Sequence, residues 1–562
     1  MIRMFERHKV RNVAELDGDW DFEPVPESAA GRPPKRYRYR MPVPDCWESH
    51  PEFRTYRGRA FYRRQVHCPQ AGPVRLVFHG VSHTATVYWD GRKVGSHYNA
   101  YTAFSIVLPA VRAGVHTLTV EADNSFGPHS ALHKPNDYYT YGGLARPVAM
   151  ECVGPVLLER IFATPRRSGR GWTLDVRFAL RNLSRQAFAG TLTADVAGQT
   201  FSAPVRLRPR QAREIAGAIR VSGVTAWAPE SPALYTLTAV LSDADGRPCD
   251  DLIERVGFRE VKVKGRKILL NGREIRLRGF NRHEDAADFG CAVPVEVMRQ
   301  DLALMTDLNA NFVRTSHYPN DERFLDLCDE RGFLVWEEHH ARALMADTMK
   351  LKSFPKQIAD CDREMVLDHY NHPSIVMWGV FNECESFTAL GRRYYEASVR
   401  RIRALDASRP LTSASCYPEK DRTLDLFDIV SFNRYVGWYW GGPDMIRPAL
   451  DKLLAWIGKV GAGGKPFLMS EFGAGAIPGW RADRRTKWTE EFQADLLAAS
   501  LDVYLKHPRV NGVAIWQFCD VRVCEEWFHS RPRCMNNKGV VDEHRRPKLA
   551  YETVKTKFGD NP

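Results

Sequence analysis

Two glutamates in this sequence each follow an apolar run that can form a buried strand. Glu383 follows SIVMWGVFN (374–382), and Glu471 follows PFLMS (466–470). Partial burial raises the pKa of a carboxyl group, whereas a nearby cation or hydrogen-bond donor lowers it. Two carboxyl groups whose pKa values differ can divide acid–base and nucleophilic work between them, as glycoside hydrolysis requires. The alternative is that each glutamate pairs with an arginine or lysine and has only a structural role.

The elements that position these glutamates are predicted from the apolar pattern after residue 257. Short apolar runs alternate there with amphipathic stretches, which is typical of βα units. Strands are predicted at 275–280, 311–316, 333–338, 374–382, 411–415, 428–435, 466–472 and 510–518, with helices between them. Eight such units predict a (β/α)₈ TIM barrel over residues 258–562, with its chemistry at the carboxyl ends of the strands.

The first 257 residues have a different pattern, with short alternating strands separated by turn residues. The pair Asp90-Gly91 between two alternating runs predicts a hairpin with a tight turn. We expect one β-sandwich over residues 1–153 and an immunoglobulin-like β-sandwich over residues 154–257. The predicted fold class is therefore multidomain, β followed by α/β.

Composition excludes fewer classes of protein function than the motifs do. The chain has 562 residues, 44% hydrophobic and 26% charged, which argues against a disordered, collagen-like or coiled-coil protein. Its 80 Lys and Arg against 68 Asp and Glu give a net charge of +12, which suits a polyanion or a small acidic ligand equally well. The densest basic stretch, RPPKRYRYR (32–40), is predicted to be an exposed strand with one solvated face, or else a nucleic-acid patch.

Cysteine usage and the apolar runs bear on location. The twelve cysteines form no CxxC pair, and no histidine cluster has zinc-finger spacing, so we predict free thiols and no metal. The N-terminus has no apolar signal region, and no stretch nears the ~18 apolar residues of a membrane helix. We therefore expect a cytoplasmic protein that contacts no membrane, and we find no nucleic-acid-binding motif.

Four longer segments carry a resemblance to a known family. They are LNGREIRLRGFNRHED (270–285), VRTSHYPND (313–321), NHPSIVMWGVFNE (371–383) and MSEFG (469–473). The chain resembles glycoside hydrolase family 2, which includes β-glucuronidases and β-galactosidases. The resemblance implies a jelly-roll-like sugar-binding sandwich, an immunoglobulin-like sandwich and a catalytic barrel, in that order. It also implies that Glu383 is the general acid/base, that Glu471 is the nucleophile of a retaining mechanism, and that Asn382 binds the sugar 2-hydroxyl.

Further matches to the β-glucuronidases of this family bear on the sugar. SFNRYVGWYWG (431–441), MNNKG (535–539) and NDYYTYGG (136–143) resemble segments of those enzymes. A uronate carries a fixed negative charge, so its pocket needs a cation and hydrogen-bond donors, whereas a neutral sugar needs no cation. The substrate-binding residues implied are Asp137, His283, His317, Asn382, Tyr435, Tyr439, Trp516, Asn536 and Lys538, and Arg533 is added as a further cation.

These observations predict a retaining β-glucuronidase that acts on a small uronic acid conjugate or oligosaccharide. A β-galacturonidase is the first alternative, because the cations Arg342, Arg531 and Arg533 can change the contacts to the 4-hydroxyl. A β-galactosidase follows, and a non-catalytic carbohydrate-binding protein is the alternative from a different class. The expected mechanism needs no metal or cofactor, and the resemblance implies a homo-oligomer.

Overall fold

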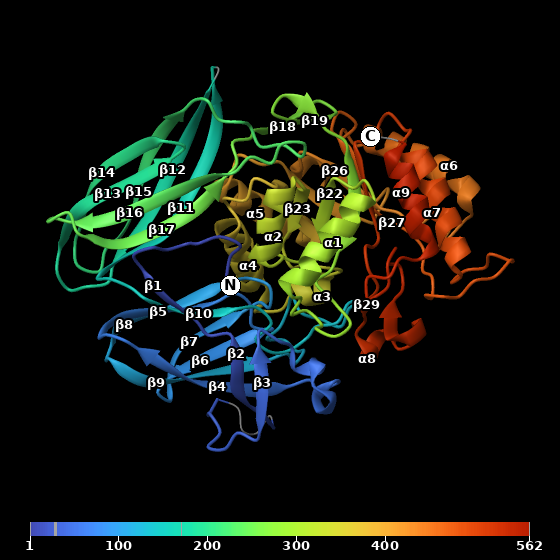
Figure 1. Ribbon diagram of the computed structural model, residues 1–562. Coiled ribbons are helices and arrows are strands. Elements are labelled where there is room, and N and C mark those ends of the chain that lie inside the picture. Colours follow the sequence, from blue (N-terminus) through green and yellow to red (C-terminus); the bar gives the residue numbers. More distant parts are fainter. Residues whose placement is uncertain (1, 27–30, 170, 561–562) are drawn as a thin grey trace.

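The computed structural model describes residues 2–26, 31–169 and 171–560. Two β-sandwiches and a barrel pack against one another, with the C-terminal helices on the outside of the barrel (Figure 1). This architecture is the one predicted from the sequence. Among the described residues, no helix is long and apolar enough to cross a membrane.

The first sandwich consists of a four-stranded sheet, β1-β10-β5-β8, and a six-stranded sheet, β3-β2-β4-β9-β6-β7. The hairpin predicted at Asp90-Gly91 joins β6 to β7, and both residues have positive φ, 49° and 77°. Its strands are β1 (Asn12–Glu15), β2 (Gly18–Val25), β3 (Tyr39–Val43), β4 (Arg59–Cys68), β5 (Gly72–Phe78), β6 (Thr84–Trp89), β7 (Arg92–Tyr98), β8 (Phe104–Val111), β9 (Gly114–Asp123) and β10 (Val148–Cys152).

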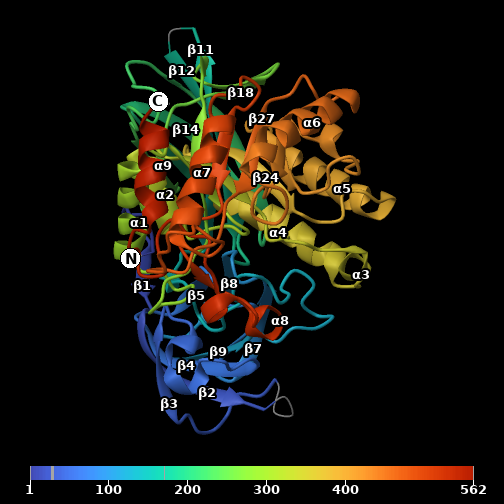
Figure 2. The ribbon, with the colours of Figure 1, turned by 90° about the vertical axis from the view of Figure 1, so that its right-hand side faces the viewer.

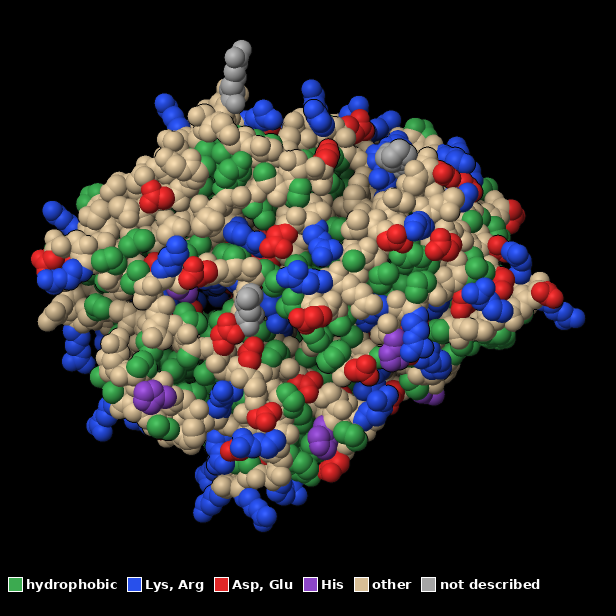
Figure 3. Space-filling view, in the orientation of Figure 1, with side chains coloured by type: hydrophobic (Ala, Val, Ile, Leu, Met, Phe, Trp, Pro, Cys, Tyr) green, Lys and Arg blue, Asp and Glu red, His purple; other side chains and the backbone are tan. Residues whose placement is uncertain are grey.

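The basic segment 32–40 departs from the prediction of an exposed strand. Only its last two residues belong to β3, which begins at Tyr39. Pro33 and Pro34 cannot donate ladder hydrogen bonds, so these two positions are unsuited to the interior of a strand. Two of its arginines pair with acids of β2: Arg38 lies 2.6 Å from Glu23, and Arg40 lies 3.1 Å from Asp21. On the face of the molecule shown in Figure 3, acidic and basic side chains are interspersed over much of the surface.

The second sandwich consists of the sheets β11-β12-β15 and β14-β13-β16-β17. Alternation along β12 places Trp172, Leu174, Val176, Phe178 and Leu180 in the core. Its strands are β11 (Val156–Ser168), β12 (Gly171–Asn182), β13 (Phe188–Val196), β14 (Gln199–Leu207), β15 (Ala212–Val221), β16 (Tyr235–Asp243) and β17 (Pro248–Val256). A small sheet of β18 (Val261–Lys264), β19 (Lys267–Leu270) and β20 (Arg273–Glu274) leads into the barrel.

Eight parallel strands close the barrel in chain order, from β21 to β28. They are β21 (Leu277–Arg282), β22 (Phe312–Thr315), β23 (Leu334–Glu338), β24 (Ile375–Asn382), β25 (Leu411–Ser415), β26 (Val430–Asn433), β27 (Phe467–Phe472) and β28 (Gly512–Ile515). Each overlaps the strand predicted from its apolar run, because a strand buried on both faces is nearly continuous in hydrophobic residues.

The helices around the barrel are α1 (Val295–Asp307), α2 (Glu322–Arg331), α3 (Ala346–Met349), α4 (Phe354–Asp368), α5 (Ala389–Leu405), α6 (Ile446–Lys459), α7 (Glu490–Tyr504) and α9 (Leu549–Gly559). One unit departs from the (β/α)₈ expectation. The described residues between β25 and β26 hold a single 3₁₀ turn (Leu424–Leu426) in place of an α-helix. The short helix α8 (Glu525–Phe528) and the pair β29 (Val521–Arg522) and β30 (Met535–Asn536) follow β28, and α8 lies near the first sandwich (Figure 2).

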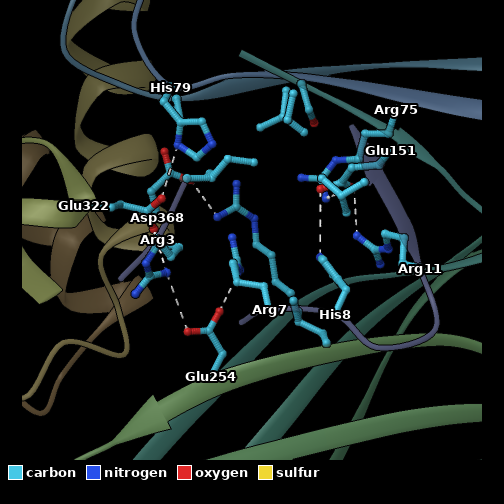
Figure 4. Close-up of a pocket in the computed structure, with 18 of the residues that line it drawn as sticks. Arg3, Arg7, His8, Arg11, Arg75, His79, Glu151, Glu254, Glu322 and Asp368 are labelled. Atoms are coloured by element: carbon cyan, nitrogen blue, oxygen red, sulfur yellow. Dashed lines mark hydrogen bonds and ion pairs between the residues drawn. The ribbon is translucent and has the colours of Figure 1, made fainter. Parts of the chain in front are cut away.

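A charged cavity of about 590 Å³ lies where the N-terminal segment meets both sandwiches and the barrel. Figure 4 shows arginines of this segment directed at acids from all three parts. Arg3 lies 2.7 Å from Asp326 of α2, and Arg7 lies 2.7 Å from Glu254 of β17. Arg11 lies 2.8 Å from Glu151 of β10. These ion pairs join the three parts of the chain, and Glu383 and Glu471 line a different cavity.

Candidate active site

Glu383 and Glu471 line one cavity of about 240 Å³ at the carboxyl end of the barrel strands. Glu471 is the fifth residue of β27, and Glu383 directly follows β24. The residues on either side of Asn382, Phe381 and Glu383, have φ values of 46° and 52°, a conformation that side chains of this size rarely adopt. Such strain is characteristic of functional sites, and here it sets the direction in which the chain leaves the strand.

The carboxylate of Glu471 is held by two donors. Nη1 of Arg314 donates to Oε1 at 2.8 Å, and the hydroxyl of Tyr435 donates to Oε2 at 2.8 Å. Burial raises the pKa of Glu471 to about 8, and nearby Glu383 adds to this rise, whereas Arg314 and Tyr435 oppose it. Both oxygens are thus fixed in direction, and each donor stabilises the ionised form.

Glu383 and Asn382 are joined through Asn433 at the end of β26. Nδ2 of Asn433 donates to Oε1 of Glu383 at 3.0 Å and to Oδ1 of Asn382 at 3.1 Å. Oδ1 of Asn382 also accepts from Arg314 at 2.9 Å. Its buried Nδ2 has no hydrogen-bond partner among the described residues, so Asn382 retains a donor for a ligand.

Lys538 lies in the wall of the same cavity, and its side chain is buried. Its Nζ lies 5.4 to 5.9 Å from the ring centroids of Tyr435, Trp438 and Tyr439. Among the residues that the structure describes, no carboxylate lies within 4.0 Å of this amine and no hydrogen bond reaches it. Burial lowers the pKa of Lys538 to about 7, and Arg531 contributes to the lowering. A buried cation of this kind is stabilised by an anionic ligand.

Asp137 reaches the cavity from the loop between β9 and β10 of the first sandwich. Nη2 of Arg342 lies 3.0 Å from its Oδ1, and Nη2 of Arg531 lies 3.2 Å from its Oδ2. Burial raises the pKa of Asp137, but Arg342 and Arg531 outweigh burial and hold it well below its ordinary value. Nη2 of Arg342 also lies 4.0 Å from Glu383, so this arginine connects Asp137 to the proposed acid/base.

The other predicted residues divide into two groups. Tyr435, Tyr439 and Trp516 line the cavity with the two glutamates. His283, His317 and Asn536 are buried behind its lining residues. His317 stacks on Trp516 with ring centroids 4.9 Å apart, His283 meets Trp516 edge-on at 5.4 Å, and Asn536 donates to Asp137 at 3.3 Å. These three side chains therefore position lining residues in this structure.

Arg533 is placed elsewhere, against the expectation that it joins Lys538. Its guanidinium pairs with Glu543 and lines a different cavity. The cation that lies near Lys538 is Arg531, two residues earlier, which the sequence marked only as an additional arginine. The φ of Arg533 is 62°, so the chain turns at this residue. Arg531 and Arg533 therefore contact different partners.

Sequence reasoning missed Arg314, Asn433, Arg434 and Trp440. Arg314 lies in β22, is fully buried, and also contacts both oxygens of Glu338 at 2.8 and 2.9 Å. Asn433 ends β26. The rule that polar residues at strand ends carry the chemistry applies to both, since each is a polar residue at the end of an apolar run.

Possible metal ligands were sought among the described residues. Asp326, Asp329 and His372 bring ligand atoms within 4.8 Å of one another. Arg3 already forms a forked pair with Asp326, and the backbone of Ser374 donates to Asp329 at 2.9 Å. The donors on these oxygens do not fit a cation site, and none of the three residues lines the glutamate cavity.

The arrangement can cleave a glycosidic bond, and comparison with known proteins supports this reading. Residues 261–560 match the TIM barrel domain of glycosyl hydrolases family 2, and residues 156–259 match a second domain of glycosyl hydrolases family 2. The chain belongs to glycosyl hydrolase family 2. Family membership and the named relatives make it a glycosidase, in preference to the non-catalytic alternative.

Relatives within the family include β-glucuronidases and a β-galacturonidase. The chain is 26% identical to the β-glucuronidase of Paenibacillus borealis, over 98% of this chain and 97% of that one. It is 48% identical to the β-galacturonidase of Eisenbergiella tayi bound to galacturonate, with a TM-score of 0.96, over 100% and 99% of the two chains. A β-glucuronidase from Ruminococcus gnavus in complex with uronic deoxynojirimycin is 25% identical, with a TM-score of 0.87 and 98% of both chains covered.

Proposed function

We propose that this glycosidase is a retaining β-hexuronidase that removes a terminal β-linked uronic acid and prefers galacturonides. The observation that carries the proposal is Lys538, a buried amine that forms no ion pair or hydrogen bond with the described residues and lines the cavity that holds Glu383 and Glu471. A uronate carboxylate supplies the missing negative charge, and a neutral hexose leaves the amine unpaired. Removing one partner of a buried charge pair costs about 3–5 kcal/mol, which is enough to separate these sugars.

In the first step, Oε2 or Oε1 of Glu471 attacks the anomeric carbon while Glu383 gives its proton to the leaving oxygen. The bond from Glu471 to the sugar forms as the glycosidic bond breaks, and the leaving group departs as an alcohol. Arg314 and Tyr435 hold Glu471 at 2.8 Å each, so the attacking carboxylate is already oriented before the substrate binds.

In the second step, Glu383 takes a proton from water, and the hydroxide attacks the anomeric carbon as Glu471 leaves. Two displacements at one carbon restore the β configuration. The free Nδ2 of Asn382 is placed to donate to the 2-hydroxyl, a contact that strengthens as positive charge develops on the ring.

The choice between the two uronic acids depends on the 4-hydroxyl. The 48% identity to the Eisenbergiella tayi β-galacturonidase supports galacturonide, the first alternative from the sequence, ahead of the glucuronide predicted first. The β-glucuronidase relatives, at 26 and 27% identity, support glucuronide as the second candidate. Arg342 and Asp137, 3.0 Å apart in the cavity wall, are available to contact that hydroxyl.

Hydrolysis of 4-nitrophenyl β-galacturonide, β-glucuronide and β-galactoside tests the proposal. We expect kcat/KM to fall in that order, and Lys538→Ala to remove most of the advantage of both uronides over the galactoside. A wild-type preference for the galactoside, or an unchanged preference in Lys538→Ala, contradicts the uronate assignment. The anomer released first, read by proton NMR, tests the retaining mechanism separately.

A further inference from the structure

The active-site cavity holds a second cation, Arg434, that forms no ion pair among the described residues; the acid near it, Glu419, is paired with Lys452 at 2.9 Å. Arg434 follows β26 and lines the cavity together with Glu383 and Glu471. Within the described part of the chain, its guanidinium forms no hydrogen bond and no ion pair, and its Nε is buried. The backbone N–H of Arg434 donates to the carbonyl of Glu471 at 2.8 Å, so its position is fixed relative to the catalytic pair.

An aromatic ring lies against this guanidinium at the rim of the cavity. The ring of Trp440 lies 5.1 Å from the guanidinium carbon of Arg434, and the residue is 40% exposed although it lines the cavity. The N–H of Gly437 donates to the carbonyl of Trp440 at 2.8 Å, which closes the loop and holds the ring in place. The pair therefore offers a cation beside an apolar face that is open to solvent.

Arg434 directly follows Asn433, whose Nδ2 donates to Oε1 of Glu383 at 3.0 Å. Burial lowers the pKa of Arg434, and Tyr504, Cys416 and Glu419 lie close enough to oppose this lowering. Cys416 in turn lies near Glu383, and the next residue, Tyr417, donates to the carbonyl of Glu383 at 3.2 Å. The charged neighbours of Lys538 are Arg531, Asp137, Glu471 and Arg342.

The position of Arg434 matters because Glu383 protonates the leaving oxygen in the proposed mechanism. The cavity, at about 240 Å³, is smaller than the ~300–1,000 Å³ of sites that enclose a drug-sized ligand. If the terminal uronic acid ring fills this cavity, as the proposed function requires, the leaving group extends from Glu383 past the rim.

We propose that Arg434 and Trp440 form a leaving-group subsite that takes a carboxylate-bearing group, such as a second uronic acid. The ring face of the leaving group packs on Trp440, and its carboxylate accepts hydrogen bonds from Arg434. This inference rests on the proposed function and adds the class of leaving group to it. The natural substrate is then an acidic disaccharide or oligosaccharide with one cation for each acid.

A pair of matched substrates tests the subsite. The 4-carboxyphenyl and 4-carbamoylphenyl β-galacturonides have leaving groups of nearly equal shape, and only the first is charged. The measured quantity is the ratio of their kcat/KM values in the wild type and in Arg434→Gln, so that leaving-group reactivity cancels. We expect the ratio to fall about tenfold in the variant, which is the effect of losing one charge-assisted hydrogen bond, and to fall in the wild type as salt is raised.

Arg533→Gln is the matched control, because Arg533 pairs with Glu543 in a different cavity. The ratio should be the same in this variant as in the wild type, and Arg434→Lys should recover part of it. If Arg434→Gln lowers kcat/KM equally for both substrates, the inference is wrong. It is also wrong if the wild-type ratio does not change as salt is raised. If Arg434→Gln instead removes the preference for uronides over galactosides, Arg434 binds the terminal sugar and the inference is wrong. Absence of cleavage of any nitrophenyl uronide defeats the proposed function itself.

Discussion

Nη1 of Arg314 lies 2.8 Å from Oε1 of Glu471, and both side chains are buried. The same guanidinium donates to Oδ1 of Asn382 at 2.9 Å, so one arginine on β22 fixes groups from β24 and β27. The orienting network is therefore built into the barrel wall, where strands hold side chains more rigidly than loops do.

The roles of the two glutamates are separable with azide. In Glu383→Ala, kcat for a substrate with a poor leaving group should fall about 10²–10⁴-fold, because proton donation is lost. Azide should then accelerate hydrolysis of the nitrophenyl uronide and give the β-uronosyl azide. In Glu471→Ala the attack must come from azide itself, and the product should be the α anomer. Proton NMR of the two products decides the assignment, and exchanged anomers would show that the roles are reversed.

Tyr435→Phe tests the control of the nucleophile. The variant removes the 2.8 Å hydrogen bond to Oε2 of Glu471, which favours the ionised form, and so raises the pKa of that carboxyl group further. Since Glu471 must be ionised to attack, the acid limb of the kcat/KM profile should move to higher pH. The measurement is the pH profile with nitrophenyl galacturonide. A limb that stays in place while kcat falls uniformly would mean that Tyr435 contacts the sugar only.

We expect the titration of Lys538 to produce the alkaline limb of the uronide kcat/KM profile. Its pKa is lowered to about 7 by burial, so the free enzyme loses this positive charge as the pH rises through that value. Glu471, with a pKa raised to about 8, must lose its proton over the same range. The uronide kcat/KM should therefore be bell-shaped, with an optimum between these two values.

Lys538→Arg is the matched variant for this limb, because arginine keeps its charge at all of these pH values. Its kcat/KM should continue to rise above the wild-type optimum, even if the absolute rate is lower. The galactoside carries no carboxylate for this residue to bind, so its profile should have the same alkaline limb in both proteins. An alkaline limb that persists unchanged in Lys538→Arg would assign it to a different group.

The sequence predicted the barrel strands and the position of two glutamates at strand ends, because both depend on local signals. Strands buried on both faces produce continuous apolar runs, and Glu383 and Glu471 stand at the ends of two such runs. Substrate-binding side chains were harder to place, since they come from loops. Arg531 and Arg533 are two residues apart, yet one pairs with Asp137 of the first sandwich and the other with Glu543. The two side chains diverge because the backbone turns at Arg533, and no local sequence pattern predicts that turn.

The roles of two histidines at strand ends also could not be predicted from the sequence. His283 and His317 stand at strand ends, where the barrel rule predicts chemistry, but both pack behind Trp516. Burial lowers the pKa of His317 well below its ordinary value, so the ring is neutral, and its Nδ1 lies 2.8 Å from Glu338. A polar residue at a strand end can thus serve the site by supporting an aromatic wall, and only the packing shows which role it has.

The docking of the N-terminal segment gives a prediction about stability. The side chains of Arg11 and Asp250 are both 1% exposed and meet at 2.8 and 2.9 Å, and Glu151 lies 2.8 Å from the same guanidinium. Arg11→Met leaves the buried carboxylate of Asp250 without its cation and leaves Glu151 with Arg75 at 3.4 Å, which should reduce the free energy of unfolding by about 3–5 kcal/mol. Thermal unfolding measures the loss. Arg247→Met is the control, because its 3.1 Å pair with Asp245 is exposed and should contribute less than about 1 kcal/mol.

The same variant should change the response to acid. Burial raises the pKa of Glu151, but Arg75 and Arg11 outweigh burial and lower it to about 2. A carboxyl group with a lowered pKa stabilises the fold above its unfolded pKa and loses that contribution as the pH falls toward the folded value. Without Arg11 the folded pKa rises, so Arg11→Met should begin to unfold at a higher pH than the wild type. Equal acid midpoints in the two proteins would show that Arg75 alone keeps Glu151 ionised and that Arg11 serves Asp250 instead.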